Sequence, residues 1–171
     1  MLYDKLIFPK RALTVILLAM LSMGFLSVSA ARKKPVQKIK VACVGNSITY
    51  GTGIQDREHF SYPVQLQNML GDKYLVGNFG KPGATLLNHG HRPYMKQEEY
   101  RQAMAFKGDI AVIHLGINDT DPRNWPNYRD EFVKDYLSLM DSLRSANPKV
   151  RFILANITPI AHRHPRFISG T

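Results

Sequence analysis

Short apolar runs separated by mixed polar segments indicate four strands in this chain of 171 residues. The runs are rich in β-branched residues and do not alternate strictly with polar ones, which is typical of strands that helices cover on both faces. They occupy residues 39–44, a segment that starts at residues 74–76, residues 109–115 and residues 150–157. We therefore expect all four strands to be buried.

The segments between these strands have the sequence features of helices. Ser61 is a suitable N-cap for a first helix, Pro63 suits its first turn, and Gly71 supplies a C-terminal stop. A second helix is expected within residues 94–106. The third helix is the clearest and ends near Asn147, because apolar residues recur three and four positions apart at Phe132, Val133, Tyr136, Leu137, Met140 and Leu143.

The alternation of strands and helices predicts an α/β fold, a flavodoxin-like three-layer α/β/α sandwich around a parallel sheet. Ligands of such sheets bind beyond the carboxyl ends of the strands. Clusters of small polar residues follow the first three strands: residues 45–47 (GNS), residues 78–83 (NFGKPG) and residues 116–119 (GIND). The fold thus predicts that three segments far apart in the sequence meet at one edge of the sheet.

The N-terminal segment has the pattern of a signal peptide. Lys5, Lys10 and Arg11 precede an uncharged run over residues 12–31, and small residues at 28–30 suit a signal peptidase. We expect cleavage near Ala30, so that residues 1–30 are the signal peptide, residues 31–38 a basic leader and residues 39–171 the folded domain. The protein would then be periplasmic or extracellular, with no stable membrane association after cleavage. The alternative is an uncleaved membrane anchor.

The net charge of +10 changes this picture little. Much of the excess lies in the leader, where Arg32, Lys33, Lys34 and Lys38 have no interleaved aromatic residues. A solvated leader fits this pattern better than a nucleic-acid site. Cys43 is the only cysteine, lies in an apolar run and excludes an intrachain disulfide.

Two chemistries fit the first polar cluster, which reads GNSITYGTG from Gly45. Glycine, serine and threonine after a first strand can bind a phosphate through backbone N–H groups. The segment lacks the Gly-Lys-Ser/Thr of a P-loop and the glycine spacing of a dinucleotide site. The other chemistry is nucleophilic attack by Ser47 on a carbonyl carbon.

Attack by Ser47 needs donors directed at the oxyanion that forms. The Ser47 backbone N–H, a backbone N–H at Gly83 and the side-chain amide of Asn118 supply three donors from three segments. A glycine suits the second position because it has no Cβ to obstruct close approach. The nucleophile hypothesis also gives Asn118 a role that a phosphate site does not.

The three clusters resemble conserved blocks of the SGNH (GDSL-like) hydrolases. GNSIT is similar to their first block, NFGKPG to their second and GIND to their third, in the same order. The resemblance covers essentially the whole chain after the leader. It implies that Ser47 is the nucleophile, that Gly83 and Asn118 complete the oxyanion hole, and that Asn46 and Asp119 support these groups. It implies no metal or organic cofactor.

One departure from the family pattern concerns the catalytic base. The family's Asp-x-x-His block follows a fifth strand, whereas the sequence ends at Thr171 in the loop after the fourth. The motif does occur at Asp56–His59, but in a loop where the family has no base, so we interpret it as a chance match. We expect a domain that lacks its last strand, last helix and Asp/His pair, with very low activity.

The remaining histidines and the tryptophan have weaker interpretations. Two closely spaced pairs occur, His89 with His91 and His162 with His164. Neither pair has a third ligand at zinc-type spacing, so both are expected to be surface residues. His162, His164 and Trp125 are candidates for the mouth of the substrate site, and the alternative for His162 or His164 is that one of them acts as the base. His114 lies within the third strand and is expected to be a core residue.

The resemblance, with an export signal, suggests a substrate. We expect the removal of O-acetyl or other short acyl groups from carbohydrates through an acyl-enzyme on Ser47. Three alternatives remain open: an esterase of lipids or lysophospholipids, a non-catalytic glycan-binding domain, and a flavodoxin-like module for phosphate or nucleotides. A small-molecule or glycan ester is the expected partner, and nucleic acid is not.

Overall fold

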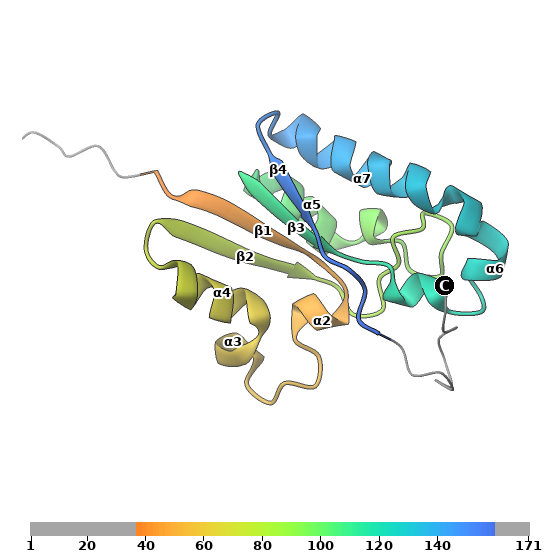
Figure 1. Cartoon of the computed structure of the whole chain (residues 1–171), viewed down its shortest axis with the longest axis horizontal. Helices are drawn as coiled ribbons and strands as arrows, with labels where there is room; N and C mark the ends of the chain where they lie inside the picture. Colours follow the sequence, from red (N-terminus) through yellow and green to blue (C-terminus); the bar gives the residue numbers. More distant parts are fainter. Residues whose placement is uncertain (1–36, 160–171) are drawn as a thin grey trace, which may run out of the picture. The chain divides into compact units, whose positions relative to one another are not determined.

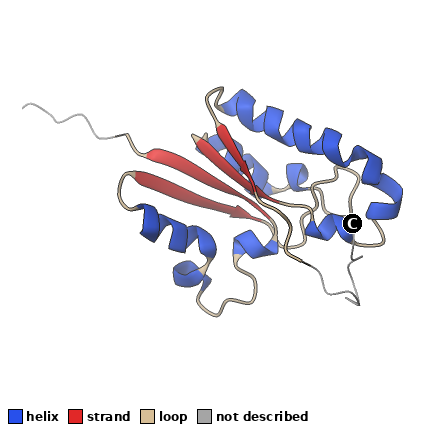
Figure 2. Cartoon of the chain, viewed as in Figure 1, coloured by secondary structure: helices blue, strands red, loops and turns tan. Residues whose placement is uncertain are grey.

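The computed structural model describes residues 37–159, which form a four-stranded parallel sheet with helices on both faces (Figure 1; Figure 2). The strand order is β2-β1-β3-β4. The strands are β1 (Ile39–Gly45), β2 (Tyr74–Gly80), β3 (Ile110–His114) and β4 (Arg151–Leu154). The predicted three-layer α/β/α fold is confirmed. The predicted signal peptide and most of the basic leader lie outside the described residues.

Helices connect successive strands, and short helical turns follow β1 and β3. The α-helices are α2 (Ser47–Tyr50), α3 (Arg57–Phe60), α4 (Tyr62–Leu70), α5 (Glu98–Phe106), α6 (Trp125–Tyr128) and α7 (Phe132–Ala146). Three 3-10 turns lie at η1 (Tyr94–Lys96), η2 (Ile117–Thr120) and η3 (Arg129–Glu131). None of the helices within residues 37–159 has the length and hydrophobicity to cross a bilayer.

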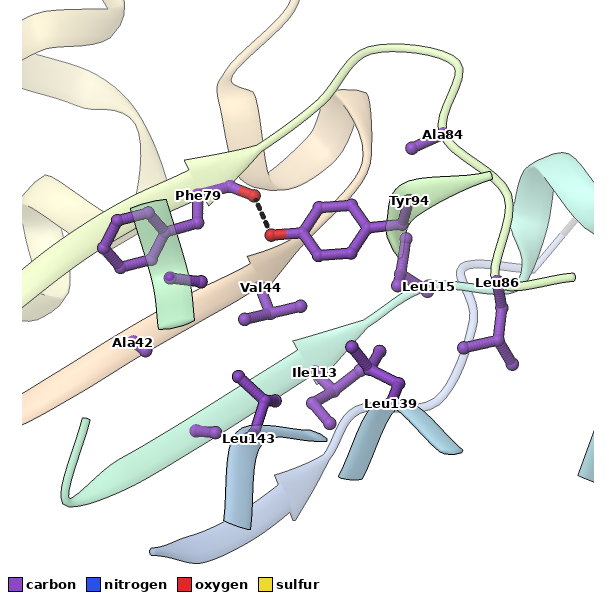
Figure 3. Close-up of a cluster of buried hydrophobic side chains, with 12 residues drawn as sticks. Ala42, Val44, Phe79, Ala84, Leu86, Tyr94, Ile113, Leu115, Leu139 and Leu143 are labelled. Carbon is purple, nitrogen blue, oxygen red and sulfur yellow. Dashed lines mark hydrogen bonds between the residues drawn. The ribbon is translucent and has the colours of Figure 1, made fainter. Parts of the chain in front are cut away.

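The two faces of the sheet carry different helices. Helices α2 and α4 contact β2, and α2 also contacts β1, on the face opposite to α5 and α7 (Figure 1). On the latter face, Val44 of β1, Ile113 of β3 and Leu139 of α7 are fully buried in one apolar cluster (Figure 3). Tyr94 crosses this cluster and donates a hydrogen bond from its hydroxyl to the Phe79 carbonyl at 2.7 Å. This hydrogen bond attaches the segment that carries Tyr94 to strand β2.

The predicted helices form where their sequence patterns placed them, with differences at the ends. Helix α4 begins after Ser61 and ends at Leu70, and the following Gly71 has a φ of +71°, a conformation that glycine adopts readily. Ser61 occupies the N-cap position as predicted, and its carbonyl accepts from the Gln65 N–H at 3.1 Å, but its side chain makes no capping bond and its buried hydroxyl has no hydrogen-bond partner among the described residues. The second helix is divided into η1 and α5, whereas the third is α7 as expected.

Two expectations about the strands need correction. Strand β2 continues through Asn78 to Gly80, so half of the second polar cluster belongs to the strand itself. Strand β4 is shorter than predicted and is not covered on both faces. Its Ile153 and Leu154 are 54% and 52% exposed within the described part of the chain. An apolar run indicates a strand but does not say which neighbours cover it.

Cys43 is fully buried in β1, as expected for a small core residue. Its burial raises the pKa of the thiol to about 11, so the thiol stays protonated at neutral pH. This cysteine therefore contributes to packing rather than to reactivity.

Candidate active site

Ser47 lies at the first position of α2, directly beyond the carboxyl end of β1. Asn46 caps this helix, because its side-chain oxygen accepts a hydrogen bond from the Ile48 N–H at 2.9 Å. The helix ends after one turn at Gly51, which has a φ of +93°. Ser47 is half-buried, and its N–H belongs to the first helical turn, whose N–H groups lack intrahelical partners. The hydroxyl and a free donor therefore lie at the same helix end.

Two strand-terminal glycines allow α2 to lie close to the sheet. A Cβ added at Gly80 would come within 2.6 Å of the Tyr50 Cα, and one added at Gly45 would be 2.8 Å from the Thr49 Cβ. Gly45 and Gly80 are also register partners on β1 and β2. Close packing of the helix on these glycines fixes the position of Ser47 relative to both strands.

The loop after β2 carries Gly83, which adopts a φ of +77°. The loop is attached to the end of β1 by a hydrogen bond from the Lys81 N–H to the Gly45 carbonyl at 2.9 Å. The first and second polar clusters are thus directly bonded to each other, as predicted from their positions at the carboxyl ends of parallel strands.

Asn118 joins the third cluster to the second. It lies in η2 after β3, is 4% exposed, and donates a hydrogen bond from its side-chain amide to the Ala84 carbonyl at 2.9 Å. Ala84 follows Gly83 directly, so the amide of Asn118 is located beside the glycine-bearing turn. The amide has a second N–H that remains available for a ligand.

Asp119 holds the adjoining part of the same loop. Its fully buried carboxylate accepts hydrogen bonds from the Leu86 and Leu87 N–H groups at 3.0 and 2.7 Å. Burial raises the pKa of Asp119 to about 6, although these two hydrogen bonds act in the opposite direction. The residue fixes the loop after β2 through these two hydrogen bonds.

Asn124 is a site residue that the sequence analysis did not identify. It is 1% exposed, donates to the Asn118 carbonyl at 2.9 Å and accepts from the His91 N–H at 3.0 Å. It therefore fixes the backbone of η2 against the loop that precedes η1. Its position in a proline-containing loop gave no signal of this role, because its partner His91 lies 33 residues away in the sequence.

Asn46 has an unusual hydrogen-bonding state. Its side chain is fully buried, and its amide nitrogen has no hydrogen-bond partner in the described part of the chain. A buried amide without a partner costs free energy, about 1–3 kcal/mol. The side chain next to Ser47 therefore has an unused donor.

Trp125 begins α6 and lines a pocket of about 290 Å³ beyond the ends of β3 and β4. Its ring packs edge-to-face on Phe132 with 5.5 Å between centroids. Gly116 and Thr120 line the same pocket, so it adjoins the turn that carries Asn118. The predicted contact of Trp125 with substrate stays a prediction. His162 and His164, the other candidates for the mouth, lie outside the described residues.

The described histidines are not bonded to Ser47. His59 forms an exposed pair with Asp56 at 2.9 Å, which raises the pKa of the imidazole. His89 is paired with Glu131 at 2.7 Å. His114 is only half-buried rather than a core residue, and its burial lowers its pKa. Within residues 37–159, Ser47 thus has no hydrogen bond to a base.

No group of three metal-ligating side chains occurs among the described residues. The groups gathered at the site are the Ser47 hydroxyl, the backbone N–H groups beside it and the Asn118 amide. A serine beside backbone and side-chain N–H donors can form a tetrahedral adduct and stabilise its oxyanion.

The sequence pattern of the GDSL-like lipase/acylhydrolase family matches residues 43–169, and the chain belongs to this family. It is 50% identical over 106 residues to an acetylxylan esterase of Xylanibacter ruminicola. That match covers 62% of this chain and 22% of the relative, so the chain spans about a fifth of that protein's length.

Solved structures share the fold at low sequence identity. A family two carbohydrate esterase from Clostridium thermocellum, in complex with cellohexaose, has a TM-score of 0.56 at 20% identity, covering 75% of this chain and 45% of that one. AlinE4, an SGNH-hydrolase family esterase, has a TM-score of 0.51 at 19% identity, covering 69% and 58%. These likenesses support the architecture of the sheet and its helices.

Proposed function

We propose that this domain is a serine esterase in which Ser47 attacks an ester carbonyl. The observation that carries the proposal is the hydrogen bond from the Asn118 amide to Ala84, which joins the third polar cluster to the turn containing Gly83. With Lys81 bonded to the end of β1, all three clusters belong to one hydrogen-bonded unit. The proposed roles of Ser47, Gly83 and Asn118 depend on this unit.

The reaction has two steps. The Ser47 oxygen forms a bond to the carbonyl carbon, and the carbonyl oxygen takes the negative charge beside the Ser47 N–H, the Gly83 N–H and the Asn118 amide. Collapse of this adduct expels the alcohol and leaves an acyl-serine, which water then hydrolyses. The Ser47 proton must pass to a base and from the base to the departing alcohol oxygen, and no base is bonded to Ser47 within residues 37–159. We therefore expect slow reaction unless a base is supplied.

The proposed substrate is an O-acetylated carbohydrate. Support comes from the acetylxylan esterase relative and from the family two carbohydrate esterase that shares the fold. An exported location, inferred from the N-terminal charge and apolar pattern, would bring the protein to such substrates. The pocket beside Trp125 gives an aromatic wall on which a sugar ring can pack.

The proposal is tested by covalent labelling of Ser47. The chain is treated with a fluorophosphonate, with and without added imidazole, and the adduct is measured by intact mass and located by peptide mapping. We expect a single adduct on Ser47, faster with imidazole because imidazole can accept the Ser47 proton. Ser47→Ala should abolish the adduct, while the exposed control Ser145→Ala should keep it. Equal labelling of Ser47→Ala and the unmodified chain would refute the role of Ser47 as the nucleophile.

A separate measurement tests the substrate class. Release of acetate from acetylated xylo-oligosaccharides is compared with release of fatty acid from a lysophospholipid, both with imidazole present. We expect Ser47-dependent acetate release and little fatty-acid release. Preference for the lysophospholipid would contradict the proposed carbohydrate substrate but not the proposed role of Ser47 as the nucleophile.

A further inference from the structure

The turn that carries Gly83 has one peptide whose orientation decides where the Gly83 N–H points. The Ala84 N–H donates to the Lys81 carbonyl at 3.1 Å, which closes a four-residue turn with Pro82 and Gly83 at its centre. Proline at the second position and a φ of +77° at Gly83 are the features of a type II turn. Types I and II differ mainly by a flip of the central peptide, here the one between Pro82 and Gly83.

Both ends of this turn are fixed independently of that peptide. Lys81 is bonded through its N–H to Gly45 at 2.9 Å, and its ammonium pairs with Glu99 at 3.1 Å. At the other end, the Ala84 carbonyl accepts from Asn118. A flip of the central peptide would leave these contacts in place and would turn the Gly83 N–H to the opposite side.

Arg92 holds the central peptide in one orientation. Its guanidinium Nη1 donates to the Pro82 carbonyl at 3.0 Å. The same nitrogen lies 3.2 Å from the position that a Cβ on Gly83 would take. The C=O and N–H of a trans peptide point in opposite directions, so a bond to the Pro82 oxygen aims the Gly83 N–H away from Arg92. A charged donor on the carbonyl also polarises the peptide and strengthens its N–H as a donor.

The backbone of Arg92 is rigidly placed. Its carbonyl accepts from the Thr85 N–H at 2.8 Å, and the neighbouring Tyr94 N–H donates to the Thr85 carbonyl at 2.9 Å. Thr85 and Tyr94 are fully buried, and the His91 N–H is bonded to buried Asn124. The guanidinium therefore extends from a fixed point to the turn. It forms no salt bridge with any described residue, so its charge is not engaged elsewhere.

We propose that Arg92 is a positioning residue for the oxyanion hole, holding the Pro82–Gly83 peptide so that the Gly83 N–H faces the reacting carbonyl. This inference rests on the proposed function of Gly83 as an oxyanion donor. Arg92 does not contact the substrate. It acts through the peptide that it binds, and its loss should leave the fold unchanged because the guanidinium is exposed.

The test compares Arg92→Met, which keeps the aliphatic stem, with Arg92→Lys, which keeps a charged donor. Arg129→Met is the control, because Arg129 is also exposed and its nearest acidic partner is 3.7 Å away. Two readouts are used: the rate of fluorophosphonate labelling of Ser47 with imidazole, and the Gly83 amide signal in the ¹⁵N–¹H spectrum.

We expect Arg92→Met to label about fivefold more slowly, the effect of a partly exposed charged hydrogen bond. Its Gly83 amide signal should shift or broaden, and its melting temperature should stay unchanged. Arg92→Lys should recover most of the rate, and Arg129→Met should match the unmodified chain. An unchanged Gly83 signal in Arg92→Met would overturn the inference even if Ser47 is never labelled. Labelling of Ser47 at the same rate in Arg92→Met would overturn it while the proposed function stands.

Discussion

The carboxyl ends of β1 to β3 and the outer strand β4 differ in the side chains that they carry and in how far those side chains are buried. At the first region, buried Asn118, Asp119 and Asn124 hydrogen-bond to backbone groups of other loops. At β4, apolar Ile153 and Leu154 are more than half exposed within the described part of the chain. The buried polar residues at the ends of β1 to β3 each need a defined hydrogen-bond partner, so they allow only one arrangement of the loops. The exposed apolar side chains of β4 set no such requirement.

The largest effect is expected for a substitution in this buried polar network, and it tests whether the network contributes to catalysis. Asn118→Ala removes the proposed amide donor and should slow labelling of Ser47 by about 10²–10³-fold, as loss of one oxyanion donor does. Asn127→Ala is the control, because Asn127 is exposed and bonds only within its own loop. The rate is measured by mass spectrometry with imidazole present. A labelling rate that falls by less than about threefold would show that Asn118 is not an oxyanion donor.

A second test compares the two regions through register partners on β3 and β4. Ile113 is fully buried and lies beside Leu154, which is 52% exposed. Ile113→Ala should lower the free energy of unfolding by about 3–4 kcal/mol, because it leaves a cavity in the core. Leu154→Ala should cost about 1 kcal/mol or less. Urea denaturation measures both, and equal losses would mean that β4 is covered in solution.

A third test uses the raised pKa of Asp119, about 6 in the folded protein against an ordinary value of 3.8. Protonation of this carboxyl therefore favours the folded state between pH 4 and pH 6, and its contribution to the free energy of unfolding is lost as pH rises through that range. The loss amounts to at most about 3 kcal/mol, since one pKa unit corresponds to about 1.4 kcal/mol.

Asp119→Asn should remove this component of the pH dependence. Urea unfolding of both proteins at pH 4 and pH 7 measures it. The variant also places an amide donor against one of the Leu86 and Leu87 N–H groups, so its stability should be lower at both pH values. An identical pH dependence in the two proteins would show that Asp119 titrates normally.

The smallest effect concerns the packing of α2. Gly80→Ala places a Cβ within 2.6 Å of the Tyr50 Cα and should cost about 2 kcal/mol more than a control without that contact. Gly53→Ala is the control, because nothing lies within 4 Å of its new Cβ; its φ of +86° adds a strain of about 1 kcal/mol that Gly80→Ala lacks, so the measured difference is a lower bound on the cost of the contact. Thermal unfolding of the two variants gives the difference. A smaller loss for Gly80→Ala than for Gly53→Ala would contradict close packing of α2 on β2.

Much of the fold follows from local patterns in the sequence. Strand β1, the Gly71 stop and helix α7 were predicted within a few residues, because apolar periodicity and glycine conformation are local properties. Helix α2 was not predicted, since one turn of helix after a strand has too few residues for periodicity. The exposure of β4 was not predicted either, because coverage depends on residues far away in the chain.

The candidate site was predicted in part. The strand-end rule brought together the clusters of Ser47, Gly83 and Asn118, and the hydrogen bonds of Lys81 and Asn118 join those clusters. Asn124 and Arg92 were missed because they act from loops whose paths are set by tertiary contacts. The catalytic roles themselves remain proposals.

The central claim is that Ser47, Gly83 and Asn118 surround one oxygen atom. The most direct measurement is a crystal structure of the chain with a phosphonate bound covalently to Ser47. The account predicts a phosphonyl oxygen about 2.7–3.1 Å from both the Gly83 nitrogen and the Asn118 amide nitrogen. An adduct whose oxygen points into solvent, away from both nitrogens, would contradict it.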